Sequence, residues 1–206
     1  MIMPAKTWTR KYVLVDIDTQ KYFFNDGGTV CVRNHRRTLA NILRMIKWAR
    51  LRNVRMVSTV QIFPDRYPYC NCRGGDLDAR KKIDYTLRKR YTSFEAEDCT
   101  DLLPQLLDYY DQVIFEKRCF DPFEEPRADR MLSELDAKEF VLVGALTEGA
   151  VRATALGLLS RRKNVTVVVD ATGSYDRRGG AITLRLLMER GARLTDTHRF
   201  LASCCS

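Results

Sequence analysis

The stretch of residues 139–172 constrains the fold of this chain more than any other part of it. Residues 140–143 form a short apolar run rich in β-branched side chains, which is typical of a buried strand. Residues 165–169 form a second such run. Residues 150–159, between them, are mostly small or apolar, which predicts a helix that packs closely on a sheet. A strand, a helix and a strand in about thirty residues predict a βαβ unit with a right-handed crossover.

The turn between the first strand and the helix is the first place to expect chemistry. Gly144 ends the strand, and Thr147 with Glu148 offers a hydroxyl N-cap and an acidic first turn for the helix. In parallel sheets, ligands bind beyond the carboxyl ends of the strands, where helix N-termini present backbone donors. The sequence therefore predicts a binding site at residues 144–150.

This stretch carries a recognisable motif. The turn and helix read G-A-L-T-E-G-A-V-R-A-T-A-L, and the second strand reads V-T-V-V-V-D-A. They resemble the isochorismatase-like cysteine hydrolases, which include nicotinamidases and N-carbamoyl amidohydrolases and whose motif is roughly G-x-x-T-x-x-C-V-x-x-T-A, then a strand ending in D-A. The matching positions are Gly144, Thr147, Val151, Thr154, Ala155, Asp170 and Ala171. The family's nucleophilic cysteine falls on Ala150, so the resemblance implies a site without its nucleophile.

A second matching segment follows the first predicted strand. Residues 12–18 are an apolar run that ends in acid, which is typical of a central parallel strand. Asp18 and Gln20, with two phenylalanines after them, resemble the family's D-x-Q-x-x-F segment. The resemblance implies that Asp18 is a general base and that Gln20, Phe24 and Thr147 bind substrate. The alternative is that Asp18 forms an Asx turn or a helix cap.

A third segment follows the strand predicted at residues 113–115. It resembles the family's K-x-x-x-S-x-F segment, with Lys117 and Phe123 in place but Asp121 where serine is usual. The resemblance implies that Lys117 lies beside the nucleophile and lowers a thiol pKa, as a nearby cation does, and that Phe123 binds substrate. The alternative is a solvated surface lysine.

The resemblance also implies how an oxyanion would be held. The backbone amides of Leu146 and Ala150 match those of the family, and a cis peptide is expected between Ala145 and Leu146. Cys119 is the one thiol placed to replace the missing nucleophile, because it lies two residues beyond Lys117. The favoured interpretation of Cys119 is a small buried apolar residue.

The remaining chain predicts further helices and strands around one sheet. Helices are expected at residues 35–52, 100–110, 124–137 and 177–191 and in the tail, strands at 54–60 and 192–195, a turn at 25–28 and a loop at 61–78. Residues 79–96 are expected to form an edge hairpin, a flap or an oligomer contact. The predicted fold is a single domain of residues 1–206, a three-layer αβα structure with a Rossmann-like, mostly parallel six-stranded sheet.

Composition limits the class of protein. A chain of 206 residues with 45% hydrophobic side chains can bury a sizeable core. It has no run of about 20 apolar residues and no secretory signal, and its seven cysteines are irregularly spaced. A cytoplasmic protein with reduced thiols is expected. Neither a metal nor another cofactor is expected, because the region that supplies histidines in zinc-dependent family members has none here.

The charge of the chain bears on its partners. Thirty-five basic and 26 acidic side chains give a formal net charge of +9, which suits nucleic acid or acidic ligands. No recognition-helix or RNA-binding signature accompanies this charge, so an arginine-rich surface is the favoured interpretation and nucleic acid is not the expected partner. A homo-oligomer is expected, because aromatic loop residues such as Phe63, Tyr67 and Tyr69 suggest cover by a second copy.

Three functional hypotheses follow from these observations. The first is a pseudoenzyme whose pocket binds a small carbonyl or carboxylate ligand or serves an assembly. The second is an active hydrolase of an amide or vinyl ether, which either uses water activated by Asp18 or has had its cysteine replaced artificially at position 150. The third is a basic nucleic-acid-binding module.

Overall fold

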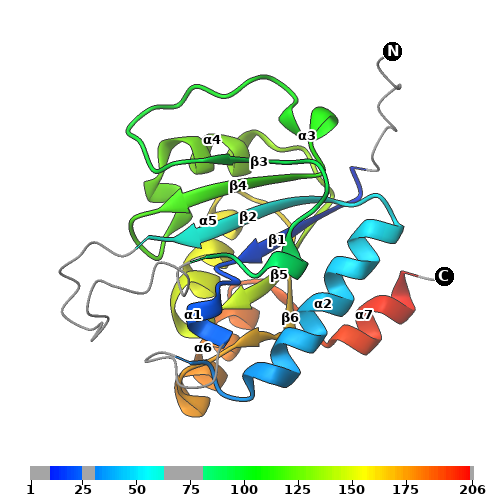
Figure 1. Cartoon of the computed structure of the whole chain (residues 1–206). Coiled ribbons are helices and arrows are strands. Elements are labelled where there is room, and N and C mark those ends of the chain that lie inside the picture. Colours follow the sequence, from blue (N-terminus) through cyan, green and yellow to red (C-terminus); the bar gives the residue numbers. More distant parts are fainter. Residues whose placement is uncertain (1–9, 25–30, 63–80, 205–206) are drawn as a thin grey trace.

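The computed structural model describes residues 10–24, 31–62 and 81–204. Its centre is one sheet of seven strands in the order β3-β4-β2-β1-β5-β6-β7, and every neighbouring pair is parallel (Figure 1). The strands are β1 (Tyr12–Ile17), β2 (Arg55–Gln61), β3 (Tyr91–Phe94), β4 (Gln112–Lys117), β5 (Glu139–Ala145), β6 (Val165–Gly173) and β7 (Arg193–Thr195). The predicted parallel αβα fold is confirmed, with seven strands instead of six.

Helices cover both faces of the sheet. They are α1 (Lys21–Phe24), α2 (His35–Leu51), α3 (Leu106–Tyr109), α4 (Pro126–Glu134), α5 (Arg152–Ser160), α6 (Arg177–Glu189) and α7 (Thr197–Ser203), with short turns η1 (Asp84–Thr86), η2 (Pro122–Glu124) and η3 (Thr147–Val151). In Figure 1, α2 and α7 lie in front of the sheet and α4 and α5 lie behind it. A sheet of continuous apolar strands needs this cover on both sides.

The alternation of side chains along β1 divides the core into two clusters. Val13, Val15 and Ile17 pack on the side of α4, α5 and α6, whereas Leu14 packs on the side of α2 and α7. All four side chains are fully buried. Successive residues of a strand point to opposite faces, so β1 contributes to both clusters.

Two of the predicted elements differ from the structure. Residues 91–94 form the parallel edge strand β3, not an edge hairpin. The helix expected at residues 100–110 is limited to α3, because the chain is irregular around Pro104 and Gln105 adopts a φ of 58° just before the helix. The turn expected at residues 25–28, most of the loop at 61–78 and the aromatic residues Phe63, Tyr67 and Tyr69 lie outside the described residues.

The topology reverses beside β1. The chain proceeds from β1 toward β2 on one side and later from β5 toward β7 on the other, so β1 and β5 flank a topological switch point. Ile17 pairs with Gly144 at the carboxyl end of these two strands. Gly144 has a φ of 124°, and a Cβ there would lie 1.9 Å from the Ile17 carbonyl oxygen. Glycine therefore allows β5 to approach β1 where open α/β sheets place their ligands.

Candidate active site

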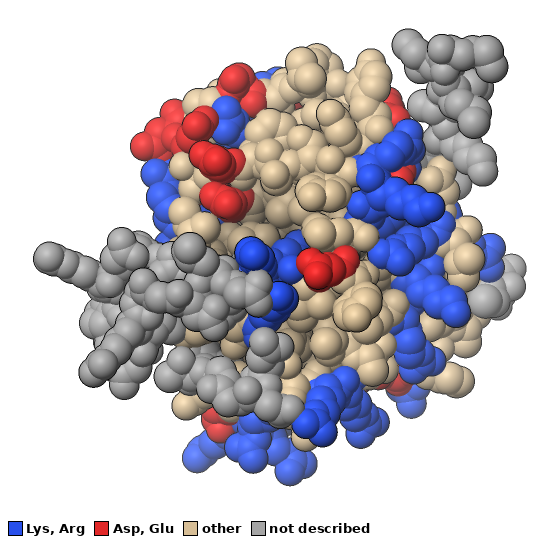
Figure 2. Space-filling model, in the orientation of Figure 1, with Lys and Arg blue, Asp and Glu red and all other residues tan. Residues whose placement is uncertain are grey.

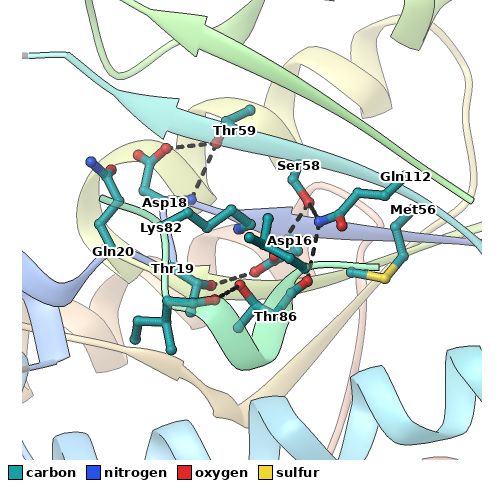
Figure 3. Close-up of polar contacts among 12 residues, drawn as sticks. Asp16, Asp18, Thr19, Gln20, Met56, Ser58, Thr59, Lys82, Thr86 and Gln112 are labelled. Carbon is teal, nitrogen blue, oxygen red and sulfur yellow. Dashed lines mark hydrogen bonds and ion pairs between the residues drawn. The ribbon is translucent and has the colours of Figure 1, made fainter. Parts of the chain in front are cut away.

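Asp18 follows β1 and turns out of the sheet. Its φ is 48°, in the left-handed region that few residues other than glycine adopt. Its N–H donates to the carbonyl and hydroxyl oxygens of Thr59, each at 3.2 Å, and Thr59 Oγ1 donates to Asp18 Oδ1 at 2.6 Å. Asp18 is 1% exposed. Thr59 therefore fixes both the backbone and the carboxylate of Asp18 (Figure 3).

Lys117 is the ionic partner of Asp18. It ends β4, and its Nζ lies 2.7 Å from Asp18 Oδ2, an oxygen that makes no hydrogen bond of regular geometry. The same Nζ donates to Gln61 Oε1 at 2.5 Å and to the Cys119 carbonyl at 3.1 Å. Lys117 is fully buried, so the interpretation as a solvated surface lysine is wrong.

Two glutamines hold this ion pair in place. Gln20 Nε2 donates to the Gln61 carbonyl at 3.0 Å, and the Gln61 N–H donates to Gln20 Oε1 at 2.8 Å. Gln61 Nε2 donates in turn to the Lys117 carbonyl at 3.2 Å. Both ends of the Gln20 amide are thus engaged by protein backbone, and its observed contacts tie the exit of β1 to the end of β2.

The turn after β5 has the backbone geometry that the resemblance implies. The peptide bond between Ala145 and Leu146 is cis, as expected. The Leu146 carbonyl accepts from the N–H groups of Gly149 at 3.1 Å and Val151 at 3.0 Å. Residues Thr147–Val151 form a π-helical turn before α5, so Thr147 is not the N-cap of a regular helix. Its hydroxyl is buried without a hydrogen-bond partner.

Ala150 lies in this turn, at the carboxyl edge of the sheet that also carries Asp18. Its side chain is fully buried and belongs to the same apolar cluster as Ile17 and Phe115. Its carbonyl accepts from Thr154 Oγ1 at 2.7 Å. The sheet order places the turn beside β1, because β5 is the direct neighbour of β1.

Phe120 connects the turn to Lys117, and the sequence did not single it out. Its ring centroid lies 6.0 Å from Lys117 Nζ, and its ring is 3.6 Å from where a Cβ on Gly149 would lie. The expected substrate residue Phe123 instead packs against α5, where the Arg161 guanidinium lies 3.9 Å from its ring centroid. Phe24 is buried in the apolar cluster under α2.

A second buried acid–lysine pair lies next to the first. Lys82 Nζ is 2.5 Å from Asp16 Oδ2, Ser58 Oγ donates to the same oxygen at 3.2 Å, and Thr19 Oγ1 donates to Asp16 Oδ1 (Figure 3). Gln112 Nε2 donates to Ser58 Oγ at 2.8 Å. Asp16 is fully buried. This network places a charge pair in the core directly before the Asp18 turn.

Cys119 is poorly suited to replace the missing nucleophile. Its Sγ donates to the Asp121 carbonyl at 3.4 Å. Burial raises the pKa of the Cys119 thiol above its ordinary value, and the hydrogen bond to Asp121 and the charge of Lys117 offset this only in part. A raised pKa lowers the thiolate fraction at neutral pH.

Disulfides, metal-binding clusters and membrane-spanning helices are absent from the described residues. Cys31, Cys99, Cys119 and Cys204 form no disulfide there. No group of three or more histidine, cysteine, aspartate or glutamate side chains within residues 10–24, 31–62 and 81–204 could hold a metal ion. In the same ranges no helix is long and apolar enough to cross a membrane.

Comparison with known proteins agrees with this geometry. A family model described as an isochorismatase domain matches residues 12–199. A comparison with curated proteins gives no match.

Several solved structures share the fold. An isochorismatase-like hydrolase from Alkaliphilus metalliredigens superposes with a TM-score of 0.72 at 19% identity, over 94% of this chain and 97% of its own. N-carbamoylsarcosine amidase from Thermoplasma acidophilum gives a TM-score of 0.67 at 20% identity, over 91% and 96%. A MAR1 ribonuclease from Caenorhabditis elegans gives a TM-score of 0.65 at 19% identity, over 94% of this chain and 81% of its own.

Proposed function

Because the chain belongs to the isochorismatase family, we propose that it is a catalytically impaired member that binds a small carbonyl or carboxylate ligand beside Asp18 and Lys117. The observation that carries this proposal is the buried Asp18–Lys117 ion pair at 2.7 Å, next to a turn with alanine at position 150. The aspartate and the lysine that match the family's motif are present in the sequence, and the cysteine that matches its nucleophile is replaced by alanine. A methyl group cannot attack a carbonyl, and loss of a nucleophile costs several orders of magnitude in rate.

The residues that remain are suited to binding and to proton transfer. Lys117 supplies an ammonium that stabilises an anionic ligand, and the backbone amides of Leu146 and Ala150 are the proposed donors to a ligand oxygen. The unpartnered Thr147 hydroxyl is a further donor in the same turn. Phe120, which contacts both sides of the site, is the proposed apolar wall.

The second candidate is an active hydrolase. Asp18 Oδ2 makes no hydrogen bond of regular geometry, which would allow it to accept a proton from water attacking a reactive vinyl ether or amide. The active hydrolase has a second form, an enzyme whose nucleophilic cysteine has been replaced artificially. A cysteine codon at position 150 in the native gene would favour this form.

Ligand binding and turnover separate the two candidates. Thermal unfolding is measured with nicotinamide, an N-carbamoyl amino acid and an isochorismate-type enol ether, and with an RNA oligonucleotide because one similar structure is described as a ribonuclease. A bound ligand stabilises the folded chain by about 2.7 kcal/mol at 100 times its Kd. We expect a shift with one small compound, no shift with Lys117→Met, and no turnover.

The controls decide the interpretation. Lys163→Met removes a lysine that contacts Phe140 near the start of β5, whereas Lys117 lies at the end of β4. This variant should leave the ligand-induced shift unchanged. Sustained hydrolysis abolished by Asp18→Asn would establish the active hydrolase instead. If no small compound shifts the folded wild-type chain, or Lys117→Met retains the shift, the proposed ligand site is wrong.

A further inference from the structure

The exposed side of α2 carries only basic charge. Residues 31–62 contain eight lysines and arginines and no aspartate or glutamate. Seven of the eight are exposed and together define the basic face, namely Arg33, Arg36, Arg37, Arg44, Lys47, Arg50 and Arg52. The apolar side of the helix packs in the core, where Ile42, Met45 and Ala49 are fully buried. Five of these seven basic residues lie within α2, Arg33 precedes it and Arg52 follows it, so this segment is uniformly basic.

The geometry of the helix aligns these charges. Arg37, Arg44 and Lys47 are seven and three residues apart, spacings that bring side chains to one side of an α-helix. Within the described part of the chain, none of these three forms an ion pair with a carboxylate. The 17 residues of α2 extend about 25 Å, which is the length of about seven base pairs of duplex.

The basic face continues beyond the carboxyl end of α2. Arg50 donates to the carbonyls of Tyr85 at 3.0 Å and Leu87 at 2.8 Å, which brings the following exposed Lys89 close to the helix. The next residue, Arg90, is exposed but paired with Asp111 at 2.7 Å. Burial lowers the pKa of Arg88, the charge of Asp111 opposes this shift, and the charges of Arg50, Arg55 and Arg90 add to it. In Figure 2, blue side chains gather along the right-hand edge over this end of α2, while most red side chains gather at the upper left.

A groove opens at the other end of the same face. It has a volume of about 510 Å³ between the first turns of α2 and α6, and Arg33, Arg37 and Arg177 line it together with Thr38 and Ser174. Asp170 also lines the groove, but its two carboxylate oxygens accept hydrogen bonds from Thr197 and Asn41. Guanidinium groups beside hydroxyl donors are well suited to phosphate oxygens.

We propose that the basic face of α2 binds nucleic acid through the phosphate backbone, a function separate from the proposed ligand site. Arginine outnumbers lysine six to one on this face, and the guanidinium fork binds phosphate in a bidentate manner where an ammonium acts as a point charge. An anionic membrane is the less favoured partner, because membrane-bound amphipathic helices insert an apolar side and that of α2 is buried in the protein. Phosphate contacts carry no sequence information, so binding depends on salt and not on sequence.

A pair of matched variants tests the proposal. The test variant combines Arg37→Glu, Arg44→Glu and Lys47→Glu. The control variant combines Lys138→Glu, Arg152→Glu and Arg162→Glu, which are also exposed and change the net charge by the same amount. These control positions lie on or beside α5, which covers the opposite face of the sheet from α2.

Binding is measured by fluorescence anisotropy with a labelled single-stranded RNA and a duplex DNA, each about 20 nucleotides long so that it spans the face. Between about 50 and 200 mM salt, we expect the wild-type affinity to fall steeply. The test variant should bind about tenfold or more weakly, and its slope of log K against log salt concentration should be shallower by about two. The control variant should keep most of the affinity and slope. Circular dichroism and the Tm establish that both variants are folded.

Three outcomes would overturn the proposal. The first is a wild-type chain that binds neither oligonucleotide at low salt. The second is an equal loss in the two variants, which would mean that net charge alone attracts the oligonucleotide. The third is binding to vesicles with anionic lipid but not to either oligonucleotide, which would assign the face to a membrane surface.

Discussion

Asp16 and Asp18 lie two residues apart at the end of β1, and each pairs with a different buried lysine. Lys82 Nζ is 2.5 Å from Asp16, and Lys117 Nζ is 2.7 Å from Asp18. The two carboxylates turn to opposite faces of the sheet. Asp16 contacts Ser58 and Asp18 contacts Thr59, and adjacent residues of β2 point to opposite faces. The left-handed backbone at Asp18 produces this reversal, since residues two apart in a regular strand share a face.

The buried pairs should be sensitive to loss of one partner. Lys82→Met and Lys117→Met each leave an unpaired carboxylate in the interior, and we expect each to reduce the free energy of unfolding by roughly 3–5 kcal/mol. Urea denaturation measures this loss. As a control, Arg130→Met removes one partner of the exposed Arg130–Glu134 pair and should cost about 0.5 kcal/mol or less. Equal small effects at all three positions would contradict the assignment of buried, charged pairs.

Asp111 should contribute to the acid sensitivity of folding. Burial acts to raise the pKa of Asp111, but the hydrogen bond from Arg90 and the charge of Arg55 outweigh burial, so the pKa is lowered. A carboxylate whose pKa is lowered in the folded state stabilises the fold at pH values above its unfolded-state pKa of about 3.9. This stabilisation is lost as the pH falls through the folded-state pKa.

We therefore expect the free energy of unfolding to fall with decreasing pH below about 4. Asp111→Asn should be less stable than wild type near neutral pH, and its stability should fall less on acidification. Urea titrations in a pH series measure both. If the difference in free energy of unfolding between wild type and Asp111→Asn stays constant across this pH range, the pKa of Asp111 does not change on folding.

Cys119 should react slowly with alkylating reagents. Because burial raises the pKa of its thiol, less thiolate is present at neutral pH than for a free cysteine of pKa about 8.5. Iodoacetamide labelling followed by peptide mass spectrometry, with N-acetylcysteine as the reference, measures the rate as a function of pH. Labelling of Cys119 that is faster than the reference near neutral pH would restore it as a candidate nucleophile.

Much of the site follows from the sequence, because it depends on where strands end. Asp18, Lys117 and the turn at residues 144–150 all follow apolar runs, and parallel strands present their carboxyl ends at one edge. The carboxylate of Asp18 and the ammonium of Lys117, which the motif gives separate roles, are in contact, and the expected cis peptide is present. The motif assigns these residues to one site, since apolar runs alone do not specify which strand ends are neighbours.

The rest depends on contacts between segments that are distant in the sequence. Gln61 at the end of β2 binds Lys117 at the end of the neighbouring strand β4, 56 positions later in the sequence. Lys82 binds Asp16 although 66 positions separate them in the sequence. No local pattern reports such contacts, although the position of Gln61 at the end of β2 is the one signal that could have pointed to it. Phe120 was missed because the motif emphasises Phe123, whose ring packs on α5 where Gly157 leaves room for it.

Ala150→Cys is the most direct test of the candidate site. The substitution returns a thiol to the position that the family fills with cysteine, in the turn before α5 and at the sheet edge that carries Asp18 and Lys117. A nearby ammonium and a helix N-terminus favour the thiolate, and Asp18 is placed to accept the proton. We expect the new thiol to be alkylated at a pH well below the pKa of about 8.5 of a free cysteine, with weak amidase or vinyl-ether hydrolase turnover.

Ala155→Cys is the matched control, because Ala155 is on the adjacent α5 and is as fully buried as Ala150. Its thiol lacks the charged pair and should resist labelling, so burial alone cannot explain a difference between the two. Adding Lys117→Met to Ala150→Cys should move the labelling of the new thiol to higher pH, since the ammonium that stabilises the thiolate is gone. If Ala150→Cys folds with the wild-type Tm and its thiol labels no faster than that of Ala155→Cys, then Asp18, Lys117 and position 150 do not form a reactive site, and the proposed ligand site loses its chemical basis.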